Sequence, residues 1–226
     1  MEALAAMPRY EAYKDSGIKW LEKIPSHWKV ERSQWLFSLR RERARKGDQQ
    51  LTASQKHGMI SQAEFMAIEG RRVTQVEFNP EILKHVEAND FIISMRSFQG
   101  GIEYCNVSGC VSSAYVPLIP RKYVYPNYFK YLFKSARYIE ALQSTSNLVR
   151  DGQALRYENF RMVALPVVPF EEQAAIANFL DQKTAQIDDA IAIKEKQIEL
   201  LKERKQIIIQ KAVTQGLDPI RANLRS

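Results

Sequence analysis

The feature that most constrains this chain is a long apolar repeat in its last quarter. Between residues 180 and 212 most positions at alternating spacings of four and three are apolar, and no glycine or proline occurs in this stretch. Such a repeat is typical of a coiled-coil helix rather than of a surface helix. Glu171 and Glu172 favour a helix start just after Pro169, and Gly216 favours its end. At the helical rise, residues 171–212 extend over about 60 Å.

This helix is predicted to need a partner. A domain of the size that precedes it is only about 30 Å across, so the helix outreaches the domain. Its apolar seam is expected to pair in a two-fold dimer or with a helix of another protein. The expected interface residues all lie on the seam: Leu180, Ile187, Ile191, Ile198, Leu201 and Ile208.

The region before the helix has a different pattern. Its short apolar runs are rich in β-branched or aromatic residues, and they predict buried strands at Phe91–Met95, Cys110–Leu118 and Met162–Val168. Pro126 and Asn127 open a helical pattern between two of these strands. In that pattern Lys130, Lys134 and Arg137 share one face.

The predicted fold class is therefore α+β. We expect a mixed α/β domain over residues 1–168, a long coiled-coil helix over residues 169–216 and a tail over residues 217–226.

The charge of the chain is concentrated in the predicted domain. The net charge is +7; residues 1–170 hold 24 Lys and Arg against 17 Asp and Glu, whereas residues 171–226 hold 9 of each. A basic globular part suits phosphate binding, because neutralised phosphates release counterions, although the same charge also favours solubility. No apolar run is long enough to cross a bilayer, and Met1–Arg9 lacks the features of a secretory signal. We expect a cytoplasmic protein that does not enter a membrane.

Signatures of catalysis, metal and cofactor binding are missing. Cys105 and Cys110 are spaced for a hairpin disulfide, but two reduced and partly buried thiols are the preferred interpretation. With three histidines in the chain they do not form a zinc signature. Gly-rich phosphate loops, Gly-x-Ser-x-Gly elbows and His-Glu-x-x-His helices do not occur. We expect no catalytic residue, no metal and no cofactor on this chain.

Several polar and basic segments are candidates for DNA contact. An arginine in a loop beside an amide or a glycine is suited to reading base edges. The expected DNA-binding residues are Arg71, Arg72, Arg96, Ser97, Gln99, Lys130, Lys134, Arg150 and Arg156. The run of five cations from Arg40 to Lys46 has two interpretations, a solvated helix end or a phosphate clamp.

Four stretches of the sequence together resemble the specificity subunit of type I restriction–modification systems. Tyr13–Trp28 resembles the entry into a target recognition domain, and Ser94–Gly101 with Ser112–Tyr115 resembles its central strand and loop. Leu165–Asp181 resembles the start of the conserved helical region. Lys183–Asp188 and Ala212–Pro219 resemble the middle and the end of that region.

The resemblance implies a division of labour. A specificity subunit of this family reads double-stranded DNA and has no active site. A separate modification subunit carries S-adenosylmethionine and methylates adenine, and a separate motor and endonuclease subunit uses ATP. Family members usually carry two recognition domains, whereas this sequence has one set of motifs. The chain is then either a half-size subunit that pairs as a homodimer on an inverted repeat, each copy reading half of a bipartite site, or a piece of a longer chain.

Two other functions stay open at this point. One is a coiled-coil adaptor whose basic domain binds nucleic acid outside restriction, and the other is a nuclease or methyltransferase with an unrecognised site. The base sequence that the chain reads does not follow from its own sequence.

Overall fold

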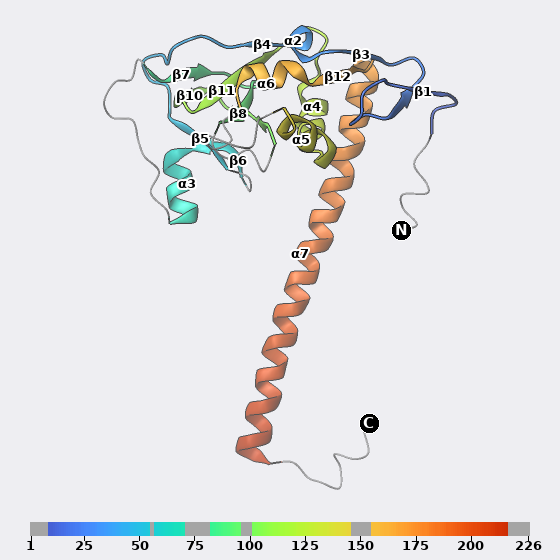
Figure 1. Cartoon of the computed structure of the whole chain (residues 1–226). Coiled ribbons are helices and arrows are strands. Elements are labelled where there is room, and N and C mark those ends of the chain that lie inside the picture. The colour runs from blue at the N-terminus through green and yellow to red at the C-terminus, as the bar shows by residue number, and fades with distance from the viewer. Residues whose placement is uncertain (1–8, 55–56, 71–81, 96–100, 146–154, 217–226) are drawn as a thin grey trace. The chain divides into compact units, whose positions relative to one another are not determined.

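A computed structural model describes residues 9–54, 57–70, 82–95, 101–145 and 155–216. It divides into two compact units, Met1–Ala177 and Asn178–Ser226. The first turns of the long helix therefore belong to the globular unit, beyond the predicted domain end at residue 168. The predicted α+β class, with a long C-terminal helix, is confirmed (Figure 1).

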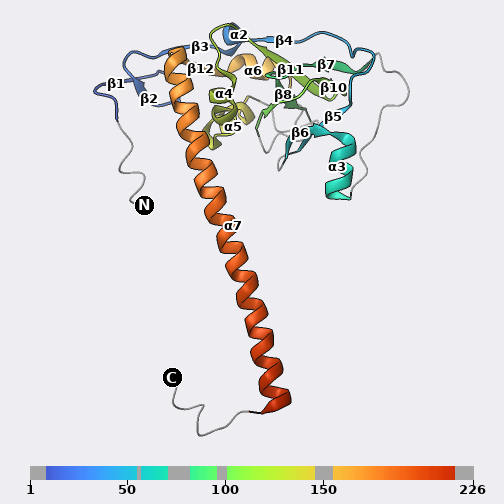
Figure 2. The same cartoon turned by 180° about the vertical axis from the view of Figure 1, so that it is seen from behind.

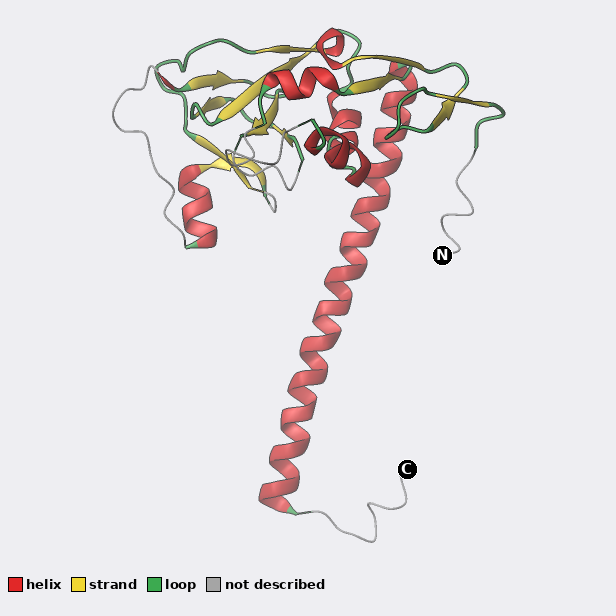
Figure 3. Cartoon of the chain, viewed as in Figure 1, coloured by secondary structure: helices red, strands yellow, loops and turns green. Residues whose placement is uncertain are grey.

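The first unit contains short strands and short helices. The strands are β1 (Tyr13–Asp15), β2 (Lys23–Pro25), β3 (Lys29–Arg32), β4 (Phe37–Leu39), β5 (Leu51–Ser54), β6 (Gly58–Ser61), β7 (Lys84–Val86), β8 (Phe91–Ser94), β9 (Glu103–Tyr104), β10 (Gly109–Val111), β11 (Tyr115–Pro120) and β12 (Ala164–Val167). The helices are α2 (Ser33–Leu36), α3 (Gln62–Glu69), α4 (Pro126–Leu132), α5 (Ala136–Gln143), α6 (Tyr157–Met162) and the start of α7 (Phe170–Gln215). Figure 3 shows this mixture of strands and helices beside the continuous α7.

An antiparallel sheet of four strands organises the unit, in the order β4-β11-β8-β9. The remaining strands pair two by two, as β1 with β2, β3 with β12, β5 with β6 and β7 with β10. The β5–β6 hairpin and α3 lie at the end of the unit away from β1 and β2 (Figures 1 and 2).

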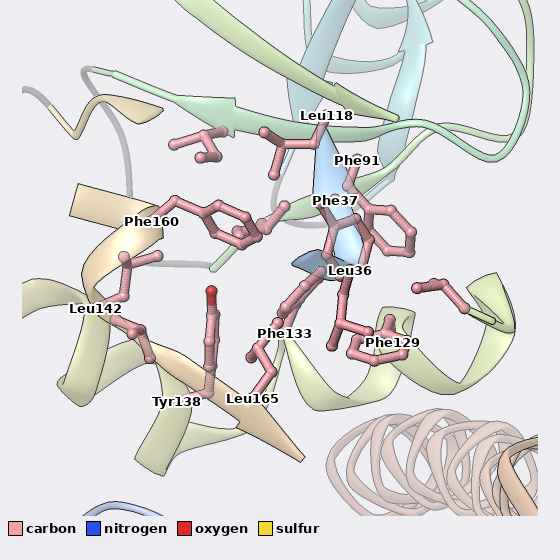
Figure 4. Close-up of a cluster of buried hydrophobic side chains, with 14 of the residues drawn as sticks. Leu36, Phe37, Phe91, Leu118, Phe129, Phe133, Tyr138, Leu142, Phe160 and Leu165 are labelled. Atoms are coloured by element: carbon pink, nitrogen blue, oxygen red, sulfur yellow. The ribbon is translucent and has the colours of Figure 1, made fainter. Parts of the chain in front are cut away.

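Strand β8 is buried on both faces. Because successive side chains of a strand point to opposite sides, it contributes to two cores. Phe91 and Ile93 belong to the larger core, and Ile92 belongs to a smaller core together with Leu51 and Val111. In the larger core aromatic rings meet edge to face: the Phe37 ring lies 5.5 Å from that of Phe91 and 5.1 Å from that of Phe129 (Figure 4). Such ring pairs stabilise a fold by more than the burial of their apolar area alone.

The smaller core also holds Cys105. Both Cys105 and Cys110 are free and buried, as the preferred interpretation predicted. Burial raises the pKa of each thiol to about 11, so neither is a reactive thiolate at neutral pH.

The structure corrects two expectations about the boundaries of elements. The single strand predicted over Cys110–Leu118 is interrupted at Ser112–Ala114, where the Tyr115 N–H donates to the Ser112 carbonyl and closes a turn between β10 and β11. The helical pattern after Pro126 is divided as well. Ser135 has extended backbone, and its hydroxyl donates to the Leu132 carbonyl, so α4 and α5 are separate.

The long helix has the bounds that the sequence predicted, with Glu171 and Glu172 in its first turn. At its end Gly216 has a φ of 73°, and its N–H donates to the Ala212 carbonyl. This is a left-handed helix cap, which glycine adopts without steric cost. Of the helices in the described residues, none is long and apolar enough to span a membrane.

Two side chains in the first turns of α7 fix its start to the globular unit. Glu172 accepts hydrogen bonds from the Tyr10 hydroxyl at 2.8 Å and the Trp28 indole at 3.0 Å, and it lies 2.7 Å from Nε2 of His27. Gln173 is buried and donates to the carbonyls of Tyr123 and Val168. The entry of the helix into the unit is therefore set by polar contacts from distant segments.

Candidate nucleic-acid interface

The loop that was predicted to read bases, with Arg96, Ser97 and Gln99, lies outside the described residues. Its two ends are described. The loop leaves β8 after Met95, whose N–H donates to the Ala114 carbonyl at 3.0 Å. It returns at Gly101, which has a φ of 81° and at which a Cβ would overlap the carbonyl oxygen of Phe133. Glycine is required here for both reasons, so the backbone at Gly101 is closely packed against Phe133.

Three other predicted DNA contacts also lie outside the described residues. Arg71 and Arg72 follow directly on Gly70, which ends α3 with a φ of 63° and an N–H bonded to the Met66 carbonyl. Arg150 belongs to the range 146–154. For these three residues the assignment stays a prediction.

Lys130 and Lys134 do not share one helix face, because Lys130 lies in α4 and Lys134 lies in the turn before α5. Lys134 forms an ion pair with Glu103, a buried residue of β9. Burial raises the pKa of Glu103, and the Lys134 ammonium counteracts this effect. Because a buried carboxylate already matches its charge, we expect Lys134 to contribute less to phosphate binding than an unmatched lysine.

The ammonium of Lys130 lies 4.8 Å from the centre of the Tyr131 ring. Arg156 precedes α6; its backbone N–H donates to the Asn159 side chain at 3.0 Å, and its own side chain is exposed. DNA contact by either residue remains a prediction.

The run from Arg40 to Lys46 is not the end of a helix, which corrects one of its two interpretations: Arg43 forms an isolated β-bridge, and Lys46 lies in a turn. Arg40 is buried and bonds Asp90 through two nitrogens, at 2.6 and 3.0 Å. Arg45 pairs with Glu42 at 2.6 Å and with Glu87 at 3.2 Å. The remaining cations of the run are exposed: Arg41, Arg43 and Lys46.

One group of side chains in this network has the composition of a metal site. Ligand atoms of Glu42, His85 and Glu87 lie within 4.8 Å of one another. The guanidinium of Arg45 already bonds both carboxylates, and Arg40 bonds Glu42 at 2.6 Å. Hydrogen bonds from Arg45 and His85, respectively, are the main causes that lower the pKa values of Glu42 and Glu87. We therefore assign the group as an ion-pair network.

The predicted dimer and partner interface lies on α7. Its large side chains are uncovered within the single chain: Ile187 is 57% exposed, Ile198 51% and Leu201 62%. Ile191 and Ile208 are exposed as well, and Leu180 is partly buried. A row of exposed leucine and isoleucine side chains is a surface that another helix is expected to cover. The partner itself remains a prediction.

Comparison with known proteins gave one family and several related structures. The model of the type I restriction modification DNA specificity domain matches residues 26–203. A structure described as the basis of complex assembly and conformational transition of the type I R-M system matches with a TM-score of 0.62 at 19% identity, covering 96% of this chain and 51% of that one. The HsdS subunit from Thermoanaerobacter tengcongensis matches with a TM-score of 0.52 at 19% identity, covering 92% and 49%. A search of curated proteins found no match. The chain thus spans about half the length of the solved structures that it resembles.

Proposed function

Since the chain belongs to the family of type I restriction–modification DNA specificity domains, we propose that it is the sequence-specific DNA-binding subunit of a type I restriction–modification complex. The observation that carries the proposal is the extent of the family match. The matched residues 26–203 include the globular unit from Ser26 and most of α7. The match therefore covers both the proposed DNA-binding unit and the helix proposed to contact partners.

Within such a complex this chain binds DNA and carries no catalytic step. A modification subunit with S-adenosylmethionine methylates adenine, and a motor and endonuclease subunit uses ATP. Each subunit is directed to the site by the DNA sequence that this chain has bound. Arg96, which is proposed to read bases, comes after β8 of the four-stranded sheet, and a loop at the end of a strand can vary while the fold stays constant.

The proposal includes a homodimer. The proposal is supported by the exposed seam of α7 and by the one set of recognition motifs found in the sequence. Two copies that pair through antiparallel α7 helices bury the exposed seam and present two equivalent reading units. A two-fold protein binds an inverted repeat, so each copy reads one half of a bipartite site.

Selection from random duplex DNA by the purified chain tests the function. We expect enrichment of two short inverted half-sites around a spacer of fixed length and free sequence. Binding should weaken steeply with salt, because phosphate contacts release counterions. Recovery of unenriched DNA, or binding without salt dependence, contradicts the proposal and favours a coiled-coil adaptor.

A second assay tests the division of labour. The chain alone, incubated with the selected DNA, magnesium and S-adenosylmethionine, should leave the DNA unmodified. Addition of a modification subunit of the same complex should then give adenine methylation at the selected site. Cleavage or methylation by the chain alone contradicts the proposed absence of catalysis.

A further inference from the structure

Lys84, at the start of β7, is partly buried, and no carboxylate among the described residues pairs with it. The ammonium of Lys84 donates to the carbonyls of Tyr115 at 2.6 Å and Ser113 at 3.3 Å. Within the described ranges it forms no ion pair. Burial lowers the pKa of Lys84, as expected when an ammonium loses water without gaining an opposite charge. Two carbonyls occupy two of its three N–H donors, so one donor remains.

A second cation lies directly opposite Lys84. Arg43 and Lys84 form an antiparallel bridge. The hydrogen bonds on its two sides run from the Ala44 N–H to the Leu83 carbonyl and from the His85 N–H to the Glu42 carbonyl, both at 3.0 Å. Arg43 and Lys84 are therefore a non-hydrogen-bonded pair, in which the Cα atoms lie only about 4.5 Å apart and the side chains leave the same face. Like charges placed directly opposite destabilise a strand pair.

The nearby acidic side chains do not neutralise this pair. Asp90 bonds Arg40, and Glu42 and Glu87 bond Arg40 and Arg45. Arg43 is exposed and makes no ion pair among the residues that the structure covers. The two cations thus stand beside a network whose carboxylates already bond other guanidinium groups.

The position of Lys84 relates it to the predicted reading loop. Its ammonium bonds the turn between β10 and β11, and the Met95 N–H bonds the Ala114 carbonyl in the same turn. Ser94 is paired with Tyr115 across the sheet. Lys84 therefore lies beside the point at which the chain leaves β8 toward Arg96.

We propose that Lys84 and Arg43 bind a phosphodiester group of the DNA backbone next to the bases that the loop after Met95 reads. The proposal rests on the proposed function. A phosphate supplies the negative charge that the partly buried ammonium lacks, and it relieves the repulsion between the two cations. Phosphate contacts of this kind set the register of a protein on the duplex, whereas base contacts specify the sequence.

Salt dependence of binding to a fixed random-sequence duplex tests the site. The variants Arg43→Gln, Lys84→Gln and the double variant are compared with a control, Lys14→Gln with Lys196→Gln, which removes the same two charges from β1 and α7. Each phosphate contact contributes about 0.9 to the slope of log K against log salt. Because the two cations bind one phosphate, the slope should fall by about 1 in the double variant and by no more than that in each single variant, and it should stay unchanged in the control. Lys84→Arg, which keeps the charge, should retain the slope.

Stability gives an independent readout. Arg43→Gln removes the like charge opposite Lys84, so its thermal midpoint at low salt should rise while its DNA affinity falls. If Arg43 had only a structural role, its replacement would lower the thermal midpoint instead. Because the Arg43 side chain is exposed, this variant is expected to fold even where a change at Lys84 loosens the turn.

The outcomes separate this site from the general function. An unchanged slope in folded Arg43→Gln and Lys84→Gln, with a steep slope in the parent chain, overturns the phosphate site and leaves the proposed function intact. A parent chain without salt-dependent DNA binding overturns both.

Discussion

Arg40 and Asp90, 50 positions apart in the chain, form a buried ion pair through two nitrogens of the guanidinium. The carboxylate of Asp90 also accepts the backbone N–H of Glu87 at 2.9 Å, so the pair joins the start of the cationic run to the turn before β8. Because Asp90 already pairs with Arg40, we expect this arginine to contribute less to DNA binding than the exposed cations of the run.

Removal of one partner leaves the other charged and buried. We therefore expect Asp90→Asn or Arg40→Ala to lower the free energy of unfolding by about 3–5 kcal/mol. The neighbouring exposed residue provides the control, since Arg41→Ala should change it by less than about 0.5 kcal/mol. Urea unfolding at neutral pH measures both, and equal effects at the two positions would contradict the assignment.

The contacts of Glu172 predict a pH dependence. Burial alone would raise the pKa of Glu172, but hydrogen bonds from Trp28, Tyr10 and His27 outweigh it and lower the pKa below its usual value of 4.5. A depressed carboxyl pKa stabilises the fold above the unfolded pKa, and this stabilisation disappears as the pH falls through the folded pKa. Glu172→Gln should cost about 1–2 kcal/mol at pH 7. The difference from the parent chain should shrink below pH about 4.5; a difference that is constant from pH 7 to pH 3 would argue against the mechanism.

The exposed seam of α7 predicts the oligomeric state. Replacement of Ile187, Ile198 and Leu201 by Asp places three charges on the seam, and it should give a monomer by light scattering. The control places three Asp residues at Gln182, Ala192 and Lys196, on the side of the helix away from the seam, and it should retain the dimer mass. An unchanged mass in the seam variant would rule out pairing through this face.

The predicted reading loop has a signature distinct from that of a phosphate site. Arg96→Ala should cost about 1–3 kcal/mol on the selected DNA and relax the preference at one base position. A loss of the same size on all sequences would instead identify Arg96 as a phosphate contact. Binding to a set of singly substituted duplexes separates the two.

Helix length should set the spacing of the half-sites. One added heptad after Leu201 keeps the seam in register and lengthens the helix by about 10 Å. In an antiparallel pair the optimal spacer should grow by about three base pairs. A spacer that stays the same would show that the two reading units are not separated by α7.

The sequence predicted the structure best where an element is determined by residues that are its neighbours in the chain. The start and end of α7 follow from Pro169, the acidic first turn and Gly216, which all lie at the ends of this helix. The interruption between β10 and β11 was missed because Val111 and Tyr115 suit a strand, whereas the turn at Ser112 depends on which strands the two segments pair with.

The site residues show the same limit. The sequence near Lys84 does not indicate a phosphate site. Its place in the proposed site depends on Arg43 across the bridge and on the carbonyls of the β10–β11 turn. Likewise, the unequal roles of Arg40 and Arg43 depend on Asp90, which only folding brings to one of them.

The pairing of β3 with β12 brings Lys29 opposite Val167 and Arg32 opposite Ala164. The chain thus enters and leaves the main body of the recognition unit at one place, beside the Trp20 indole that donates to the Ala164 carbonyl at 3.1 Å. A segment whose two ends are adjacent can be exchanged without stretching what flanks it. Under the proposed function, exchange of the stretch between β3 and β12 would therefore change the DNA sequence that is read and leave α7 unchanged.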